Sequence, residues 1–593
     1  MGNLEGAFLF GVENSASGAS WIAPKKAKEN LKELFTQRFD LSEAMSELLV
    51  NRGFKLDDLP DFFDPKIKNL MPDPSILMDM DKTVERLLKA IINKEIIGVF
   101  GDYDVDGACS SAIISSYLTR LGCNVKVHIP DRFTEGYGPN TDALLKLKKQ
   151  GCNLIVTVDC GITAFEPLKK AKENEIDIIV IDHHITEPTL PEAYSIINPN
   201  RFDQKGNLGY LAAAGVCFLT LVALDRALRK NSYETKIDLR KFLDLVALAT
   251  ICDVVPLKFL NRAFVSTGLK VMGLRQNPGL KALFDMSNIR EIPNEQNLGY
   301  IVGPRINAAG RLGNSNLGVE LLCANDDVNA NLLAEKLNKL NEERKDIQNS
   351  VLESAINKLD KIDISSKNVI VLADEGWHEG VIGIIAGRIK DRFHKPAVII
   401  AINKDGIGKG SSRSVTGFDI GSAIIAAQQN DILLTGGGHS MAAGLSVKKE
   451  KLELLDTFLN ERFSKADKIN ARLKDYKIEV IINISAANNK IVEEFQKIAP
   501  FGAENIEPLI AISKIRVINF RSVGKEGKHF SFIATDESGS RLNCIAFNVA
   551  GSEVGDAIIS ASNGPLMHII GFLRENNFNN KPQLQIVDCF LLN

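Results

Sequence analysis

Hydrophobic residues recur with two spacings along this chain, and these spacings predict its secondary structure. Between about residues 80 and 255, short apolar runs alternate with segments of helical spacing. This alternation predicts a parallel sheet with helices on its faces, and runs that are apolar throughout predict strands buried on both sides. The predicted strands are Ile96–Phe100, Val125–Ile129, Leu154–Val158 and Ile178–Ile181, and the predicted helices are Ala108–Leu121, Thr141–Gln150 and Ala164–Asn174.

The remaining segments follow other patterns. Residues 1–70 predict a mostly helical segment, and 329–359 predict one long helix with a polar outer face. A second α/β pattern comes next, with strands Val369–Leu372 and Ala397–Ile402 around a helix, Val381–Arg392. Short alternating runs then predict a small β-barrel, with strands Lys477–Ile484, Lys514–Phe520, His529–Thr535, Arg541–Phe547, Met567–Phe572 and Gln583–Cys589.

These patterns define the fold class and the domains. The fold is α/β: two α/β domains joined by a long helix and followed by a β-barrel. The predicted parts are a helical segment (1–70), a first α/β domain (71–325), a connecting helix (326–359), a second α/β domain (360–465) and the barrel (466–593).

Composition excludes several classes of protein. The 593 residues are 45% hydrophobic and 24% charged, typical of a globular protein, and no apolar run reaches the ~20 residues that a membrane span needs. The N-terminus has no secretory signal pattern. Nine cysteines without a Cys-x-x-Cys pair argue against a zinc ribbon or a disulfide framework and predict a cytoplasmic location. Because the net charge is −3, a nucleic-acid partner would need local basic patches.

Acidic residues follow the ends of three predicted strands. Asp102, Asp104 and Asp106 follow the first, Asp159 follows the third, and Asp182-His183-His184 follows the fourth. The carboxyl ends of parallel strands lie at one edge of a sheet, where ligand sites form. Carboxylates buried together without partners would cost several kcal/mol, so the arrangement predicts a divalent metal site. Taken singly, these residues could be a solvated acidic turn, a helix cap or a core histidine, but their joint placement favours the metal.

Two further acids lie in the apolar helical run 242–252 and at its end. Asp244 is expected on the polar side of that helix. Asp253 ends the run in an apolar setting, where a lone carboxylate is destabilising, so a cation is expected beside it. The alternative is an exposed turn residue.

The motifs in this order resemble those of a known family. Gly101-Asp-Tyr-Asp-Val-Asp-Gly107, Val158-Asp-Cys-Gly161, Asp182-His183-His184 and Asp253-Val-Val-Pro-Leu257 are similar to the motifs of the DHH phosphoesterase superfamily. Four further stretches resemble the RecJ family of single-strand-specific exonucleases: Arg132-Phe-Thr-Glu-Gly-Tyr-Gly138, Gly303-Pro-Arg-Ile-Asn-Ala-Ala-Gly-Arg311, Trp377-His-Glu-Gly-Val-Ile-Gly383 and Gly436-Gly-Gly-His439.

The resemblance implies a function and its cofactors. It implies a nuclease with two Mn²⁺ or Mg²⁺ ions that degrades single-stranded DNA to mononucleotides from the 5′ end, in recombination and repair. It also implies a DHH-associated second domain, an OB-type barrel, and single-strand-binding protein and a helicase as partners. Asp159 would bridge the two ions, with Asp104 and His183 on one and Asp106 and Asp253 on the other. His184 would orient the site or contact phosphate, and Asp102 would support the ligands.

Substrate contacts are expected on both α/β domains and on the barrel. Arginine binds phosphate bidentately, glycine allows close backbone approach, and aromatic rings stack on bases. The candidates are Arg305, Asn307 and Arg311 in a stretch expected to be irregular, then Trp377, His378, Ser411, Arg413 and His439, and on the barrel Lys514, Arg516 and Phe520. The alternatives are an interdomain salt bridge for the arginines, hydrophobic packing for the tryptophan and a solvated basic face for the barrel.

Two other functions are compatible with parts of the pattern. A phosphatase of short oligonucleotides or cyclic dinucleotides could use the same metal centre, but a small substrate would not need the basic, aromatic barrel. A non-catalytic scaffold in a replication or repair assembly is the other alternative, but a degenerate site should have lost ligands and here none is missing.

Overall fold

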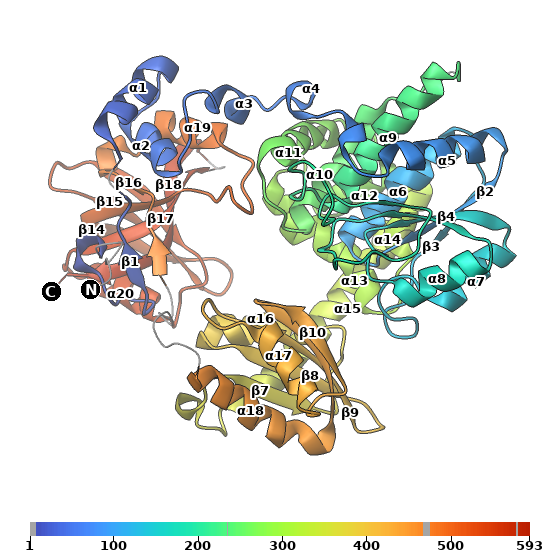
Figure 1. Cartoon of the computed structure of the whole chain (residues 1–593). Helices are drawn as coiled ribbons and strands as arrows, with labels where there is room; N and C mark the ends of the chain where they lie inside the picture. The colour runs from blue at the N-terminus through green and yellow to red at the C-terminus, as the bar shows by residue number, and fades with distance from the viewer. Residues whose placement is uncertain (1–7, 26, 234, 466–474, 577–578, 593) are drawn as a thin grey trace. The chain divides into compact units, whose positions relative to one another are not determined.

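The computed structural model describes residues 8–25, 27–233, 235–465, 475–576 and 579–592 (Figure 1). These residues form two compact units. One unit contains 65–465 together with 502–505, and the other contains 8–64, 475–501 and 506–592. The predicted boundary after 465 adjoins residues 466–474, which lie outside the described part.

The first domain of the larger unit is built on a five-stranded parallel sheet of order β3-β2-β4-β5-β6. Alternate strand residues face two cores, as in Val156 on one side and Ile155 on the other. Helices α7 and α8 cover one face and α5, α6 and α9 the other. The bounds are β2 (Ile96–Gly101), β3 (Val125–His128), β4 (Cys152–Val158), β5 (Asp177–Ile181), β6 (Ser195–Ile197), α5 (Met80–Ile92), α6 (Val105–Arg120), α7 (Thr141–Lys149), α8 (Phe165–Glu173) and α9 (Ala213–Lys230).

The predicted parallel sheet is therefore confirmed, with β6 as a strand that the sequence pattern did not reveal. β6 has only three residues, too few for a periodic signal.

Helices complete this domain. They are α10 (Leu243–Cys252), α11 (Phe259–Gly273), α12 (Pro278–Met286), α13 (Gly303–Arg311), α14 (Leu317–Leu322) and α15 (Asp327–Leu359), with α4 (Ile67–Leu70) before the sheet. The stretch 300–313, expected to be irregular, is instead a π-helical turn that leads into α13. Its glycines allow helix packing, because a Cβ on Gly310 would lie 2.7 Å from the Tyr103 carbonyl oxygen.

The predicted long helix is α15, which connects the two α/β domains. Its first half packs into the core of the first domain through Leu333 and Leu337. Its second half packs into a core of the second domain through Val351 and Leu359. The helix therefore belongs to both cores, in addition to spanning the distance between them.

The second domain has a mixed sheet of order β10-β11-β9-β8-β7, in which only β7 and β8 pair in parallel. Helix α16 packs on one face, and α17 and α18 pack on the other. The bounds are β7 (Ile370–Asp374), β8 (Ala397–Ile402), β9 (Ile407–Arg413), β10 (Thr435–His439), β11 (Ala442–Lys448), α16 (Ile382–Phe393), α17 (Ile420–Gln429) and α18 (Leu452–Lys465). Strands β9, β10 and β11 were not predicted, because glycine and serine replace the apolar residues that mark a strand.

The smaller unit is the predicted barrel. Strands β14, β15, β16, β18 and β17 form a ring that closes between β17 and β14. The bounds are β14 (Leu509–Val523), β15 (His529–Thr535), β16 (Arg541–Ala546), β17 (Met567–Asn576) and β18 (Lys581–Leu591), with β13 (Val480–Ile481), α19 (Asn489–Lys497) and α20 (Glu553–Ala561) packed around them.

The N-terminal segment belongs to this barrel unit. Strand β1 (Ser20–Ile22) pairs in parallel with β12 (Asp475–Lys477). Helices α1 (Glu29–Phe39), α2 (Glu43–Asn51) and α3 (Leu59–Phe63) contribute Phe35, Leu48 and Leu59 to the barrel core. None of the helices in the described residues is long and apolar enough to cross a membrane.

Candidate metal centre and adjoining cavity

The carboxyl edge of the parallel sheet brings the predicted acids together. Asp106 is in the first turn of α6 and is 1% exposed. Its carboxylate accepts hydrogen bonds from the backbone nitrogens of Ala213 and Ala214 at 2.7 and 2.8 Å. These two N–H groups lie at the N-terminus of α9, where anions are stabilised. Asp106 is therefore held in place between the starts of two helices.

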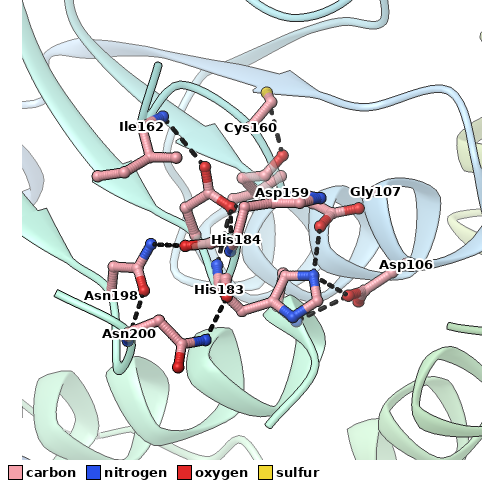
Figure 2. A network of polar contacts seen from close by, with 12 residues as sticks. Asp106, Gly107, Asp159, Cys160, Ile162, His183, His184, Asn198 and Asn200 are labelled. Atoms are coloured by element: carbon pink, nitrogen blue, oxygen red, sulfur yellow. Dashed lines mark hydrogen bonds and ion pairs between the residues drawn. The ribbon is translucent and has the colours of Figure 1, made fainter. Parts of the chain in front are cut away.

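His183 is the centre of this cluster. Its Nε2 lies 3.3 Å from Asp159 Oδ1, 3.5 Å from Asp253 Oδ2 and 3.8 Å from Asp106 Oδ2. Figure 2 shows the imidazole directed at the carboxylates of Asp106 and Asp159 from the loop after β5. Asp159 has a left-handed backbone, with φ of 60°, which turns the chain sharply at the end of β4.

Asp182 positions the two histidines. It is fully buried and accepts hydrogen bonds from the backbone nitrogens of Ile162, His183 and His184, and from Nδ1 of His184 at 2.7 Å. Asn198 and Asn200 donate to the backbone carbonyls of His184 and His183 (Figure 2). The sequence analysis did not assign roles to Asp182 or to these asparagines; the only signal for the latter is their position after β6.

Burial and the charges of neighbouring groups shift the pKa values of the aspartates and of His184 in this cluster. Burial, and then the charges of neighbouring aspartates, raise the pKa of Asp159 well above its usual range. The same causes raise the pKa of Asp253 to about 8. Burial opposes protonation of His184, but the hydrogen bond and charge of Asp182 outweigh it and raise its pKa to about 9. The cluster is thus strained by its own negative charge.

The cluster fits divalent cations. Asp159 Oδ1, His183 Nε2 and Asp253 Oδ2 are buried and have no hydrogen-bond partner among the described residues. Buried polar atoms are almost always paired, so three unpaired ones facing each other indicate a missing ligand. Three groups of side chains are close enough to share an ion: Asp159-His183-His184, Asp106-His183-Asp253 and Asp102-Asp104-Asp159. Oxygen and imidazole donors are those that Mn²⁺ and Mg²⁺ accept in proteins.

These three groups of side chains also refine the roles expected for the aspartates. Asp159 belongs to two of the three groups, as a bridging ligand would. Asp102, expected only to support the ligands, is within reach of Asp104 and Asp159. Asp244 belongs to none of these groups: it is 4% exposed at the start of α10, where the Leu245 backbone nitrogen donates to it. It was expected on a polar helix face, but α10 is buried all round.

A cavity of about 1330 Å³ adjoins the cluster. Its walls come from both α/β domains of the larger unit. Tyr103 and Tyr137 line it, and the ring of Tyr137 makes an edge contact with His184, 6.3 Å between centroids. Arg132 and Arg413 line it as well. Neither Arg132 nor the tyrosines were among the predicted site residues, although all three lie in or beside the quoted motifs.

Three arginines gather near this cavity. Burial, and then the charges of Arg132 and Arg344, lower the pKa of Arg311 to about 10. Burial, followed by the charge of Arg132, also lowers the pKa of Arg413. Arg311 donates to the Gly380 carbonyl at 3.2 Å, which is an interdomain contact but not a salt bridge. Cations that repel each other without a carboxylate between them are typical of a phosphate site.

The other predicted contacts on this unit have different positions. Ser411 and His378 line the cavity, but His439 lies exposed at the end of β10 and is not part of its lining. Arg305 and Asn307 are half-buried on α13, where Arg305 bonds to Asn338 and to the Ile301 carbonyl. Trp377 is 7% exposed and its indole nitrogen donates to Ser354, which supports the packing alternative.

The barrel candidates lie on β14 in the smaller unit. Lys514 and Arg516 are exposed, while the neighbouring Ile515 and Val517 point into the core. Phe520 packs against the core and against Phe530, with 5.1 Å between ring centroids. Lys514 and Arg516 form no ion pair with the described residues, whereas the ring of Phe520 is largely packed.

Comparison with known proteins identifies the family. Family models match residues 96–250 (DHH family, N-terminal domain), 366–465 (DHHA1 domain) and 478–588 (RecJ OB domain). A single-stranded-DNA-specific exonuclease RecJ from Bacillus subtilis is 33% identical over 579 residues, which are 97% of this chain and 71% of that protein. The chain belongs to the RecJ family.

Other RecJ proteins agree with this assignment. The single-stranded-DNA-specific exonuclease RecJ of Escherichia coli is 33% identical over 88% of this chain and 91% of its own length. The crystal structure of RecJ in complex with Mn²⁺ from Thermus thermophilus matches with a TM-score of 0.80 and 26% identity, covering 96% of this chain and 79% of that one. The expected DHH, DHH-associated and OB domains are thereby confirmed.

Proposed function

We propose that this RecJ-family protein is a metal-dependent exonuclease that degrades single-stranded DNA to mononucleotides from the 5′ end. The observation that carries the proposal is the convergence of ligand atoms from Asp159, His183 and Asp253, which have no hydrogen-bond partner among the described residues, beside a cavity lined by Arg132 and Arg413, which form no ion pair with the described residues. The two alternatives considered from the sequence have no observation in their favour.

The proposed ligands of two ions are Asp104, Asp106, Asp159, His183 and Asp253. In support, His183 lies within reach of Asp106 and Asp253, Asp104 lies within reach of Asp159, and Asp159 belongs to two of the three groups. Bound divalent cations supply a nucleophile at neutral pH and stabilise charge on the scissile phosphate. Asp182 keeps His184 oriented through its Nδ1, so the other ring nitrogen is free to face the substrate.

The second domain supplies the phosphate contacts. Arg413 and Ser411 on β9 line the same cavity as Tyr103 and Arg132 of the first domain. A terminal phosphate held by Arg413 and Ser411 would place the first phosphodiester toward the metal cluster. Each hydrolysis would break the bond from phosphorus to the O3′ of the first nucleotide and leave a new 5′-phosphate on the shortened strand, ready for the next cycle. Arg311 and Arg132 would neutralise the charge that builds up near the cut.

The remaining contacts and the cellular setting complete the proposal. Arg305, Asn307, His378 and His439 would contact the strand farther from the cut, and Lys514, Arg516 and Phe520 would bind it on the barrel. Single-strand-binding protein and a helicase are proposed as partners in recombination and repair, because this substrate must be unwound and kept open. All nine cysteines are free thiols, which favours the cytoplasm.

The test uses DNA of one sequence labelled at either end. With Mn²⁺, a 5′-labelled single strand should release labelled mononucleotide at once, whereas a 3′-labelled strand should shorten through a ladder. Duplex DNA and single-stranded RNA of the same sequence should be cut at least tenfold more slowly, and EDTA should stop the reaction. Release of labelled mononucleotide from the 3′ end first, or equal cutting of duplex DNA, would contradict the proposal.

A further inference from the structure

Part of one sheet face in the second domain is not covered by a helix. Helix α16 packs on this face over β8 and β9, through Ile385 against Ile399. Helices α17 and α18 cover the opposite face. Most residues of β9, β11 and β10 that share the α16 side line the cavity, although His439 does not. This open face carries polar residues and glycine where a buried face would carry apolar side chains.

The strand register arranges these residues in three rows. The first row is Arg413, Ala442 and His439, the second is Ser411, Gly444 and Gly437, and the third is Lys409, Ser446 and Thr435. Rows are two residues apart along each strand, or about 6.6 Å. The first two rows hold the proposed contacts to the terminal phosphate. The third row lies one step beyond them along the strands.

The third row consists of hydrogen-bond donors. Lys409 is exposed and forms no ion pair within the described residues. Ser446 lines the cavity, and its hydroxyl forms no hydrogen bond with the described residues. The Ser446 hydroxyl is therefore available to donate to a ligand in the cavity. Thr435 adds a second hydroxyl on the adjacent strand.

The third row is better suited to bind an anion than a nucleobase. Glu379 is the one acid in the lining of this cavity, and it lies before α16 rather than on the sheet. No phenylalanine, tyrosine or tryptophan stands in any of the three rows, and the third row has no ring on which a base could stack. Between the rows the path is open, because a Cβ built on Gly437 or Gly444 would meet nothing within 4 Å.

We propose that Lys409, Ser446 and Thr435 form a second anion subsite that binds the β- and γ-phosphates of a 5′-triphosphorylated strand. The α-phosphate would then lie at Ser411 and Arg413. This inference rests on the proposed exonuclease function and names an additional substrate end for the same site.

The subsite is occupied only during the first hydrolysis of a strand. Water adds to the phosphorus of the first phosphodiester, the bond from that phosphorus to O3′ of the first nucleotide breaks, and O3′ takes a proton. The first product is a nucleoside 5′-triphosphate. The shortened strand begins with a monophosphate, so every later cycle leaves the third row empty.

The experiment compares two single-stranded DNAs of one sequence, with a 5′-mono- or a 5′-triphosphate and a 3′ label. The first cut is followed in Mn²⁺, and the first product is identified by chromatography. We expect the wild-type protein to cut both strands, to release a nucleoside triphosphate from the second, and to show a KM several-fold lower for it. Lys409→Ala should raise the KM for the triphosphate strand about fivefold more than for the monophosphate strand, with kcat retained.

Two further variants control the result. Lys404→Ala removes a lysine of the β8–β9 turn that is exposed and outside the cavity lining, and it should change neither KM. Ser446→Ala should raise the triphosphate KM in the same direction as Lys409→Ala. Cutting of the monophosphate strand but not the triphosphate strand, or equal effects of Lys409→Ala on both, would overturn the subsite. If neither strand is cut, the exonuclease proposal itself fails.

Discussion

Two buried carboxylates in this protein have opposite hydrogen-bond surroundings. Asp588, on β18 of the barrel, is fully buried and has no ion pair within the described residues. Five donors surround it: Ser15 Oγ, Ser17 N and Oγ, the indole nitrogen of Trp21 and the backbone nitrogen of Cys589. Asp159, at the edge of the parallel sheet, is 2% exposed, and its Oδ1 accepts no hydrogen bond from the described residues.

The difference shows how to tell a structural acid from a functional one. Hydrogen bonds to a buried carboxylate stabilise its charge and attach one segment to another, as Asp588 attaches the N-terminal segment to the barrel. A buried carboxylate that faces other carboxylates without donors is destabilising unless a cation is bound. Burial alone does not distinguish the two; the partners of each oxygen do.

The largest expected effect is on catalysis. Asp159→Asn should lower kcat on single-stranded DNA about 10³-fold or more, because the amide cannot bridge two cations. Asparagine tolerates the left-handed backbone at this position, so the fold should be kept. Mn²⁺ should raise the melting temperature of the wild-type protein by preferential binding to the folded state, but not that of the variant. Activity within tenfold of wild type would remove Asp159 from the metal site.

The next effect is on stability. Asp588→Ala should cost about 3 kcal/mol in free energy of unfolding, because the Trp21 indole and the serine hydroxyls lose their acceptor. Urea unfolding followed by Trp21 fluorescence measures this loss. Asp588→Asn, which keeps an acceptor oxygen, should cost less. The metal-induced rise in melting temperature should persist in both variants; its loss would show that the two carboxylates are not independent.

The smallest effect concerns a third kind of buried acid. Burial raises the pKa of Asp244 to about 7, although the Leu245 backbone nitrogen and the charge of Arg120 act in the other direction. The unfolded carboxyl has a pKa of about 3.9. The folded state therefore keeps a proton that the unfolded state has released, and stability falls as pH rises from about 4 to about 7.

Asp244→Asn should remove that dependence. In EDTA, the free energy of unfolding of the wild-type protein should decline by about 2 kcal/mol relative to the variant between pH 5 and pH 7. Taking the difference in free energy of unfolding between the two proteins cancels the contributions of the other titrating groups. A constant difference over this range would mean that Asp244 is ionised throughout and has a partner that burial does not reveal.

Long, strongly patterned elements could be predicted from the sequence. Strands β2 to β5, the helices between them, α15 and the barrel strands all have a periodic apolar signal, and the signal depends on local residues only. The short β6 and the glycine-rich β9, β10 and β11 have none. They are strands because neighbouring strands pair with them, and that is a property of the assembled sheet.

The metal site likewise has features that the sequence predicts and features that it does not. The types and order of its residues, from Asp102 to Asp253, were sufficient to predict a metal site, because carboxylates after successive parallel strands must meet at one edge. Tertiary structure alone decided that Asp182 holds the histidines, that the Trp377 indole nitrogen bonds to Ser354 at the edge of the cavity, and that Arg132 lies beside Arg311 and Arg413. Such outcomes depend on contacts between segments far apart in the chain. The local sequence does not reveal which of these segments lie close together in space.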